Sequence, residues 1–314
     1  MKHTNSLIAE MQSEASKHFV ISNLKENVNR LRLKYHAKND LPYKELIDQI
    51  EARQRLKKKN DLWLANPEIL FPPKISQEQS SSDKTAEFKS EIVEGKSFID
   101  ATGGMGIDSY FLSRSIQSGV YCELDPYLCS LAAHNFKTLK ANIIVKNTDG
   151  LKFINELKEP VDLIYLDPAR REKGKKLVSL TDYQPNVPLH LDAILNKAKT
   201  VMIKASPMLD IKMASRELRK IKKVYVISVN NECKELLFIL EKENNSEPFI
   251  EAVNITGNSI ELLASSKSQF PIEYGKPLKY LYEPNASIMK ANLFNEVSAK
   301  YALKKLPQLS FVYI

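Results

Sequence analysis

The chain has 314 residues, of which 43% are hydrophobic, and this share is enough for a large buried core and argues against bulk disorder. Mean hydropathy is −0.33, and no apolar run approaches the ~20 residues that cross a bilayer. The polar N-terminus, MKHTNSLIAEMQSEASKHF, argues against a signal peptide and predicts a cytoplasmic protein. The three cysteines (Cys122, Cys129, Cys233) lack metal-ligand spacing and are odd in number, which predicts free thiols and no metal site.

Residues 1–75 are predicted to form a helical N-terminal region. Leu46, Ile47, Ile50 and Leu56 are spaced for one apolar stripe, and the preceding proline suits a helix start. Residues 1–60 contain 13 Lys+Arg and 7 Asp+Glu, or +6 of the total formal charge of +8. The densest run is 53–59. It indicates either a surface that binds a polyanion or, as is commoner for an isolated charge run, a solvated helix face.

The middle region, 76–265, is predicted to form the main domain. It opens with SQEQSSSDKTAEFKS, which on composition could be a flexible linker after the helix-breaking prolines of FPP. From residue 97 onward short apolar runs alternate with helical patterns. Strands are expected at 97–102, 120–125, 142–147, 161–168, 201–206 and 223–230, and helices at 126–139, 191–198 and 209–221. This rhythm predicts a Rossmann-like, doubly wound α/β fold with a parallel sheet between helices.

The rhythm ends with two apolar runs, 223–230 and 235–242, that only four residues separate. A parallel crossover needs a dozen or more residues, so these runs should form an antiparallel hairpin. A doubly wound sheet with a terminal reversed pair fits a methyltransferase sheet better than a dehydrogenase sheet. Residues 266–314 are predicted to be a small C-terminal segment that is too short for a substantial core of its own.

The first candidate site is the sequence DATGGMGID, from Asp100 to residue 108, between a predicted strand and a predicted helix. Its glycines Gly103, Gly104 and Gly106 permit positive φ and close approach of the backbone to a ligand. Serine occupies the third glycine position of the dinucleotide fingerprint. An acid such as Asp100 fits a cationic, phosphate-free ligand better than a pyrophosphate. The alternative interpretation is a tight turn without a ligand.

Two further acids follow the next two strands. Glu123 closes the second strand, where an acid can accept hydrogen bonds from ribose hydroxyls. Asp125 is a close alternative, although with Pro126 behind it a helix-capping role is favoured. Asp149, after the third strand, could accept from an adenine amino group or could cap a helix.

The fourth candidate site is the sequence Asp167-Pro168-Ala169-Arg170-Arg171 after the fourth strand. Ligands of open sheets bind outside the carboxyl ends of the strands. Asp167 and a nearby carbonyl could accept from an amine and orient its lone pair, while Arg170 and Arg171 could bind phosphates or stack on a base. The alternative is a turn with exposed arginines.

Together, DATGGMGID, CELDP, NTDG and LDPARR resemble motifs I to IV of class I S-adenosylmethionine (SAM)-dependent methyltransferases. With EQSSSDKTAEFK, IKASPMLDI, NECKELL and YLYEPNASIMKA, the chain is similar, from about residue 49 onward, to a bacterial family. In that family a ferredoxin-like segment and a THUMP-like domain follow the catalytic domain. The resemblance implies SAM as cofactor and RNA as partner. The ferredoxin-like segment is expected here and the THUMP-like domain is not.

The resemblance also implies site residues. Asp100, Thr102, Gly103, Gly104, Gly106, Glu123, Asp149 and Thr85 would bind SAM; Asp167 and Pro168 would be catalytic; Arg170, Arg171 and Lys204 would bind substrate. For Thr85, a capping box near Ser82 is an equal alternative. Threonine at 102 departs from the usual glycine, and Arg170 departs from the base-stacking aromatic of amine-directed enzymes.

The chain is therefore expected to methylate an RNA base by direct transfer. DPAR resembles the loop of RNA 5-methyluracil methyltransferases, but those enzymes need a cysteine nucleophile where this chain has Lys204-Ala205-Ser206-Pro207. The alternatives are a protein or small-molecule substrate, or a non-catalytic RNA-binding protein with a degenerate methyltransferase fold. A nucleotide-dependent oxidoreductase is disfavoured by the hairpin and the missing third glycine.

Overall fold

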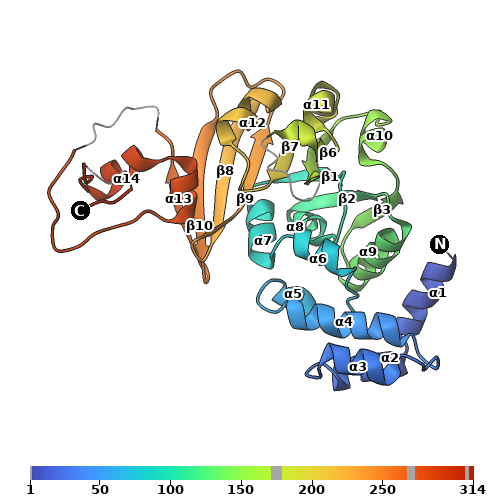
Figure 1. Cartoon of the computed structure of the whole chain (residues 1–314). Coiled ribbons are helices and arrows are strands. Elements are labelled where there is room, and N and C mark those ends of the chain that lie inside the picture. The colour runs from blue at the N-terminus through green and yellow to red at the C-terminus, as the bar shows by residue number, and fades with distance from the viewer. Residues whose placement is uncertain (1, 171–178, 267–272, 308–310) are drawn as a thin grey trace. The chain divides into compact units, whose positions relative to one another are not determined.

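A computed structural model describes residues 2–170, 179–266, 273–307 and 311–314 (Figure 1). The chain divides into two compact units, Met1–Glu156 and Leu157–Ile314. This division falls inside the predicted main domain, and the boundaries 1–75, 76–265 and 266–314 stay a prediction.

The first unit begins with a layer of helices, as the hydrophobic spacing predicts. Leu46, Ile47 and Ile50 are buried and pack with Met11 and Phe19. The predicted stripe is thus confirmed, and its helix begins directly after Pro42. The helices before the first strand are α1 (Lys2–Met11), α2 (Glu14–Ser22), α3 (Val28–Tyr35), α4 (Tyr43–Arg55), α5 (Asp61–Leu64), α6 (Lys74–Gln79) and α7 (Asp83–Glu91).

The segment that composition marks as a linker is helical, so that interpretation is wrong. It forms α6 and α7, and Ser82 caps α7 by accepting a hydrogen bond from the Thr85 N–H at 3.2 Å. Its polar side chains Ser81, Thr85 and Lys89 are buried, because α7 packs against the helix that follows the first strand. Composition shows polarity but cannot show which polar side chains have buried partners.

A parallel βαβ arrangement completes the first unit. Strand β1 (Gly95–Asp100) pairs with β2 (Ile116–Glu123), and β2 pairs with β3 (Ile143–Asn147). Asp100 lies opposite Tyr121, and Glu123 lies opposite Asn147, so the carboxyl ends of the strands are aligned. The connecting and following helices are α8 (Ile107–Ser115), α9 (Pro126–Thr138) and α10 (Gly150–Asn155).

The second unit continues the α/β pattern with mixed strand directions. Parallel pairs are β4–β7 and β8–β10, and antiparallel pairs are β7–β9, β8–β9 and β10–β11. Its large strands are β4 (Val161–Leu166), β7 (Ala198–Ala205), β8 (Ile221–Val229), β9 (Glu232–Leu240), β10 (Phe249–Thr256) and β11 (Ser259–Ala264). Its other elements are β5 (Ala169–Arg170), η1 (Leu180–Asp182), β6 (Tyr183–Gln184), α11 (Val187–Leu195), α12 (Ile211–Leu218), α13 (Ala286–Ala291) and α14 (Phe294–Tyr301).

The predicted hairpin is confirmed as β8–β9. Its turn consists of Asn230 and Asn231, whose φ angles of 50° and 63° are the left-handed values that asparagine tolerates in tight hairpins. In the sheet of the second unit, β9 lies between β7 and β8 with reversed direction. This mixed α/β sheet confirms the predicted class I methyltransferase fold, although β10 and β11 extend it beyond the expected hairpin.

The C-terminal segment packs around α13 and α14. Ile288, Val297 and Tyr313 are buried, and the Tyr313 hydroxyl donates to the Phe294 carbonyl at 2.9 Å. Helix α13 contacts β8, β9 and β10. Over the residues described, no helix has both the length and the apolar character required to cross a bilayer.

Candidate functional site

Asp100 organises the loop after β1. Its Oδ1 accepts hydrogen bonds from the backbone N–H groups of Thr102 at 3.0 Å and Gly103 at 3.1 Å, and its Oδ2 accepts from the Ser109 hydroxyl at 2.5 Å. The residue is only 1% exposed. A buried carboxylate needs such donors to offset its lost hydration. Asp100 therefore determines the shape of the glycine loop, and Ser109, which the sequence did not single out, helps to hold it.

The glycine loop passes against the end of β2. A Cβ on Gly103 would lie 2.7 Å from the Cys122 carbonyl oxygen, and the φ of Gly103 is 36°, so no other residue fits there without strain. Gly104 and Gly106 also have positive φ, 72° and 85°. A Cβ on Gly104 would have a single neighbour within 4 Å, at 3.9 Å. The backbone at Gly104 therefore faces open space into which a ligand can fit.

Glu123 connects β2 to this loop. Its Oε2 accepts from the Gly104 N–H at 2.9 Å, and its Oε1 accepts from the Asp125 N–H at 2.8 Å. The Tyr121 hydroxyl donates to the Gly104 carbonyl at 2.7 Å, so the end of β2 holds Gly104 on both sides. A carboxylate offers about four acceptor sites, which leaves two on the half-buried Glu123 for hydroxyl donors. Asp125 accepts from the Tyr127 N–H at 2.7 Å, which confirms its capping role.

Asp149 lies beside the same loop. It is exposed and caps α10 by accepting from the Lys152 N–H at 2.9 Å. A Cβ on Gly150 would lie 2.0 Å from the Ala101 carbonyl oxygen, so the first turn of α10 packs directly on the loop. Gly150 was not predicted from the sequence, although a glycine at the first position of a capped helix was an available signal. The cap is confirmed, and contact of Asp149 with adenine stays a prediction.

Thr85 lies in α7, which a buried ion pair connects to α8. Thr85 is 1% exposed and its hydroxyl donates to the Ser82 carbonyl at 3.2 Å, so its capping-box environment is confirmed. One turn later, the Lys89 ammonium, with no exposed surface, lies 3.1 Å from Asp108 Oδ1. Ser81 donates to Asp108 at 2.8 Å and accepts from Lys89 at 3.0 Å. No sequence pattern indicates this pairing, because its members are distant in the chain.

The thiols next to the loop are poor nucleophiles. Burial raises the pKa of Cys122 to about 12 and the pKa of Cys129 to about 11. The Cys129 Sγ also donates to the Glu123 carbonyl at 3.3 Å. Both thiols are therefore protonated near neutral pH. Covalent attack requires the thiolate, so these two side chains support no covalent mechanism.

The second unit positions Asp167 and Lys204 next to each other. Strands β4 and β7 pair in parallel with Leu166 opposite Ile203, so the residues that follow this pair emerge at the same edge. Asp167 Oδ2 forms an ion pair with the ammonium of Lys204, which is 9% exposed. Pro168 is buried beside them.

The two predicted substrate arginines follow Asp167 and Pro168. Arg170 contributes backbone to β5, which pairs with β6 (Tyr183–Gln184). Arg171 lies outside the described residues.

The basic run 53–59 contributes fewer exposed charges than its composition suggests. Arg53 and Lys59 donate to backbone carbonyls, and Arg55 forms an ion pair within its own helix. Lys57 and Lys58 are exposed. The run is therefore mainly a structural element, and the expectation that its whole length contacts phosphates is corrected to two lysines.

The residues of the first unit fit SAM by the chemistry of their donors and acceptors. Carboxylates stand at or just after the carboxyl ends of the three parallel strands, at Asp100, Glu123 and Asp149. They surround an open glycine backbone and favour a cation. A dinucleotide would bring a pyrophosphate to these acids, which its charge opposes.

Comparisons with known proteins agree with this fit. A crystal structure of a candidate methyltransferase from Porphyromonas gingivalis is 27% identical and has a TM-score of 0.81, covering 98% of this chain and 78% of that one. Two relatives from Mycobacterium tuberculosis, described as uncharacterised SAM-dependent methyltransferases, are 24% identical over 263 residues, or 80% of this chain. The chain spans 65% of the length of these relatives.

The C-terminal segment provides an independent match. Residues 280–314 fit the model of a ferredoxin-like domain family. This match lies where the sequence predicted a ferredoxin-like segment, and it follows a domain with the class I methyltransferase fold. The chain is therefore similar to SAM-dependent methyltransferase homologues, and it carries a segment that matches a ferredoxin-like domain at its C-terminal end.

Proposed function

We propose that the chain methylates an RNA base by direct transfer from SAM, without a cysteine nucleophile. The observation that carries the methyl-transfer part is the glycine loop, which Asp100 and Glu123 hold open at the carboxyl ends of β1 and β2. Direct transfer is supported by the two buried, protonated thiols and by Lys204-Ala205-Ser206 at the position where a covalent enzyme would carry its cysteine.

Some of the proposed cofactor residues maintain the shape of the loop, and others would contact the ligand. Asp100 and Ser109 maintain the loop, so Asp100 acts on the cofactor mainly as a nearby negative charge. Glu123 has free acceptor capacity for the ribose hydroxyls, and the exposed Asp149 can accept from the adenine amino group. The buried Thr85 supports the loop through α7. SAM, when bound, supplies an electrophilic methyl group.

Asp167 and Pro168 would hold the acceptor. An amine that donates to Asp167 has its lone pair oriented, and such positioning supplies up to about 7–11 kcal/mol of barrier reduction in favourable cases. The buried ammonium of Lys204 pairs with Asp167 and restricts its rotamers, because a charge-assisted hydrogen bond has defined geometry. Lys204 is thereby a positioning residue for Asp167.

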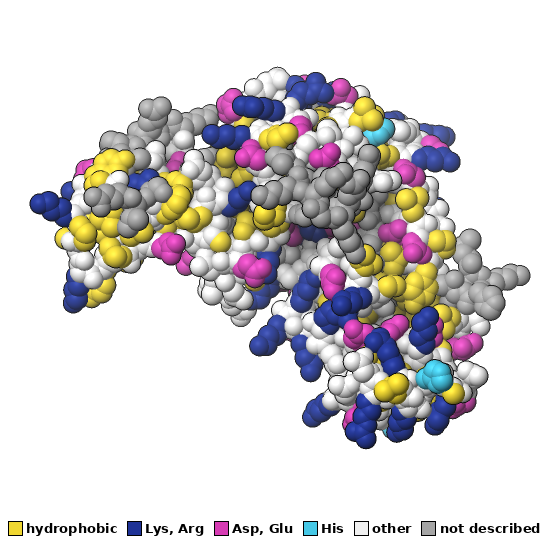
Figure 2. Space-filling model, viewed as in Figure 1, with side chains coloured by type: hydrophobic (Ala, Val, Ile, Leu, Met, Phe, Trp, Pro, Cys, Tyr) yellow, Lys and Arg dark blue, Asp and Glu magenta, His cyan; other side chains and the backbone are white. Residues whose placement is uncertain are grey.

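The choice of RNA rests on charge. Exposed cations cluster in the N-terminal helical region, where Figure 2 shows many dark blue side chains. Exposed there and outside the ion pairs of the described residues are Lys25, Arg30, Lys34, Lys38, Lys44, Lys57 and Lys58. Arg170 and Arg171 would add phosphate contacts next to the acceptor residues. Loops and single strands are the favoured substrates, because a base in a duplex must first be flipped out.

Nucleoside mass spectrometry tests the proposal. RNA from cells without the gene should lack one methylated nucleoside, and the wild-type gene should restore it. Asp167→Ala should fail to restore it while the purified variant still binds S-adenosylhomocysteine in calorimetry. Asp192→Ala, which removes an exposed carboxylate of α11, is the matched control and should restore the nucleoside. Absence of S-adenosylhomocysteine binding by the wild type would refute the cofactor, and restoration by Asp167→Ala would refute the role of Asp167.

A further inference from the structure

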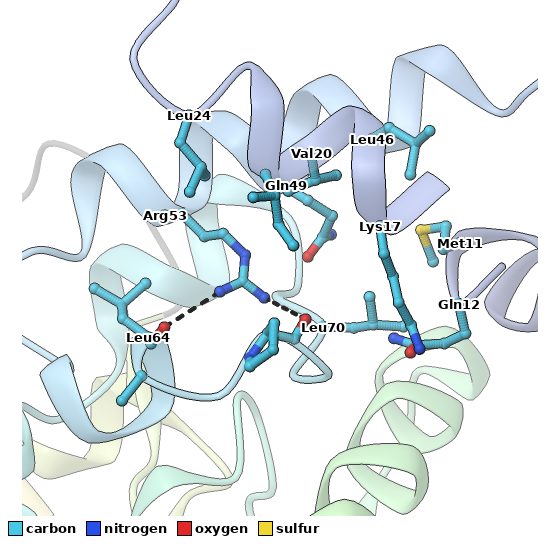
Figure 3. Close-up of a pocket in the computed structure, with 13 residues that line it drawn as sticks. Met11, Gln12, Lys17, Val20, Leu24, Leu46, Gln49, Arg53, Leu64 and Leu70 are labelled. Carbon is cyan, nitrogen blue, oxygen red and sulfur yellow. Dashed lines mark hydrogen bonds between the residues drawn. The ribbon is translucent and has the colours of Figure 1, made fainter. Parts of the chain in front are cut away.

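A cavity of about 120 Å³ lies among the N-terminal helices, away from the glycine loop in sequence (Figure 3). Its buried lining consists of the apolar side chains Met11, Leu46 and Leu70 and the polar Gln49. Ile21 and Pro67, also in the lining, are exposed, so the cavity opens to solvent. The proposed methyl transfer uses none of these residues.

Arg53 extends from α4 into this cavity, as Figure 3 shows. Its terminal nitrogens donate to backbone carbonyls, including those of Pro67 at 2.9 Å and Ile69 at 2.8 Å. Its Nε is buried and has no hydrogen-bond partner among the described residues. The Oε1 of Gln12, also in the lining, is buried and without a partner in the same set.

The charge of Arg53 has no counter-ion in the described chain. No described carboxylate lies within ion-pair distance of its guanidinium, whereas Lys17, the other cation of the lining, pairs with Glu68 at 2.8 Å. Burial lowers the pKa of Arg53 to about 10, so the guanidinium still carries its charge at neutral pH. Arg53 is partly buried, and removing a cation from water without an anion is costly unless a ligand supplies one.

We propose that this cavity binds a small apolar carboxylate, whose anionic group lies beside the Arg53 guanidinium and whose body fills the space between Met11, Leu46 and Leu70. The volume limits the size of the ligand, because an apolar cavity of about 150 Å³ encloses a benzene molecule and this one, at about 120 Å³, is smaller. Since the cavity opens to solvent, a small ring or a short branched chain can be enclosed in part, with the remainder at the opening.

A purely structural role for Arg53 explains only part of its geometry. Arg53 holds the segment after α5 through its terminal nitrogens, and its guanidinium lies 5.1 Å from the centre of the Phe71 ring. These contacts use neither the Nε nor the cavity. A structural arginine at this place would need no open space beside it, and the surrounding leucines could close over it.

Benzoate is the probe for this site, with benzyl alcohol as the neutral comparison. The chain has one tryptophan, Trp63, next to the lining residue Leu64, so the single indole N–H signal in a nitrogen-15 NMR spectrum reports binding. Benzoate should shift this signal saturably, and benzyl alcohol should bind at least tenfold more weakly. Arg53→Met should abolish the benzoate shift, and Arg30→Met, an exposed arginine of α3, should leave it unchanged.

Val20→Phe keeps the test valid if Arg53→Met disturbs folding. Val20 lines the cavity, so a larger ring there fills the space and leaves Arg53 and its carbonyl partners in place. Loss of benzoate binding in this variant supports the site. No saturable shift in the wild type, equal affinity for benzyl alcohol, or unchanged binding in Val20→Phe would each overturn the proposal.

Discussion

At the scale of single residues, the acids near the glycine loop already have protein partners. Asp100 accepts from two backbone N–H groups and two hydroxyls, and Glu123 accepts from two backbone N–H groups. Each carboxylate thereby fixes backbone that a ligand would meet. A substitution at either position should consequently change the loop as well as any direct contact, so loss of binding alone cannot separate the two effects.

Breaking the buried Lys89–Asp108 ion pair should lower stability strongly, because each of the two charges compensates the other. Lys89→Met leaves the carboxylate of Asp108, a residue 8% exposed, without its cation. We expect a loss of about 3–5 kcal/mol in the free energy of unfolding, measured by urea titration. Lys222→Met, which removes an exposed pair with Glu241, should cost under about 1 kcal/mol.

A double variant separates the effect of the ion pair on stability from the effect of the surrounding packing. Lys89→Met with Asp108→Leu removes both charges, so it should recover much of the loss. If the double variant loses as much free energy of unfolding as the two single variants lose together, the ion pair is not the cause of the destabilisation.

Cys122 should make stability depend on alkaline pH. Burial raises the pKa of its thiol from 9.0 to about 12, so the unfolded chain releases this proton at lower pH than the folded one. The stabilisation is complete below pH 9 and is lost as the pH rises toward 12. Urea titrations should show the wild type losing up to about 1.4 kcal/mol per pH unit more than Cys122→Ala in this range. Parallel curves would contradict the assignment.

At the scale of elements, the features that sequence predicted are those with local signals. The glycine loop, the Asp125 cap with Pro126 and the β8–β9 hairpin each depend on residues a few positions apart. The errors involve partners far along the chain. The segment 74–91 has linker composition, but Ser81, Lys89 and Ser90 are buried, and α7 packs against α8. Likewise, the side chains of Arg53 and Lys59 donate hydrogen bonds to backbone carbonyls that lie 11 to 19 residues further along the chain.

The strands β10 and β11 show the same limit. β10 pairs in parallel with β8, although the whole of β9 lies between them in sequence. Hydrophobic alternation can indicate a strand, but not which earlier strand it joins. The site residues at strand ends were predictable because parallel strands align their carboxyl ends whatever the rest of the sheet does. The side-chain partners of those residues were not.

Gly150→Ala tests how far the docking of α10 supports the cofactor loop. The new Cβ would lie 2.0 Å from the Ala101 carbonyl oxygen, so the helix or the loop must move. Such overpacking costs about 1–3 kcal/mol of stability. Affinity for S-adenosylhomocysteine should fall on the order of tenfold, about 1.4 kcal/mol, in calorimetry.

Gly257→Ala is the matched control for this prediction. Gly257, unlike Gly150, has a positive φ, 59°, and nothing lies within 4 Å of its Cβ position. It should lose some stability and retain the wild-type affinity for the ligand. Equal effects of the two alanines on affinity would show that Gly150 has no special connection with the loop.

At the scale of the whole molecule, positive charge is concentrated on the exposed surface of the N-terminal helices. The formal charge is +8, and residues 1–60 contribute +6. Since Arg53, Arg55 and Lys59 are used inside the fold, the exposed lysines and arginines around them remain as candidates for phosphate contacts. The number of phosphates bound can be measured, because each neutralised phosphate releases a counter-ion.

The Lys57→Gln/Lys58→Gln variant tests whether these exposed charges bind RNA. Both side chains are exposed, so removing them should leave stability unchanged. For single-stranded RNA, the dependence of log affinity on log salt should become shallower by about 1.4, since each contact contributes about 0.7. Lys222→Gln/Lys242→Gln, which removes two exposed lysines of the second unit, is the matched control and should keep the wild-type slope. Equal slopes in all three proteins would exclude the two N-terminal lysines from the interface, and an equal reduction in both variants would show that net charge, not this surface, attracts the RNA.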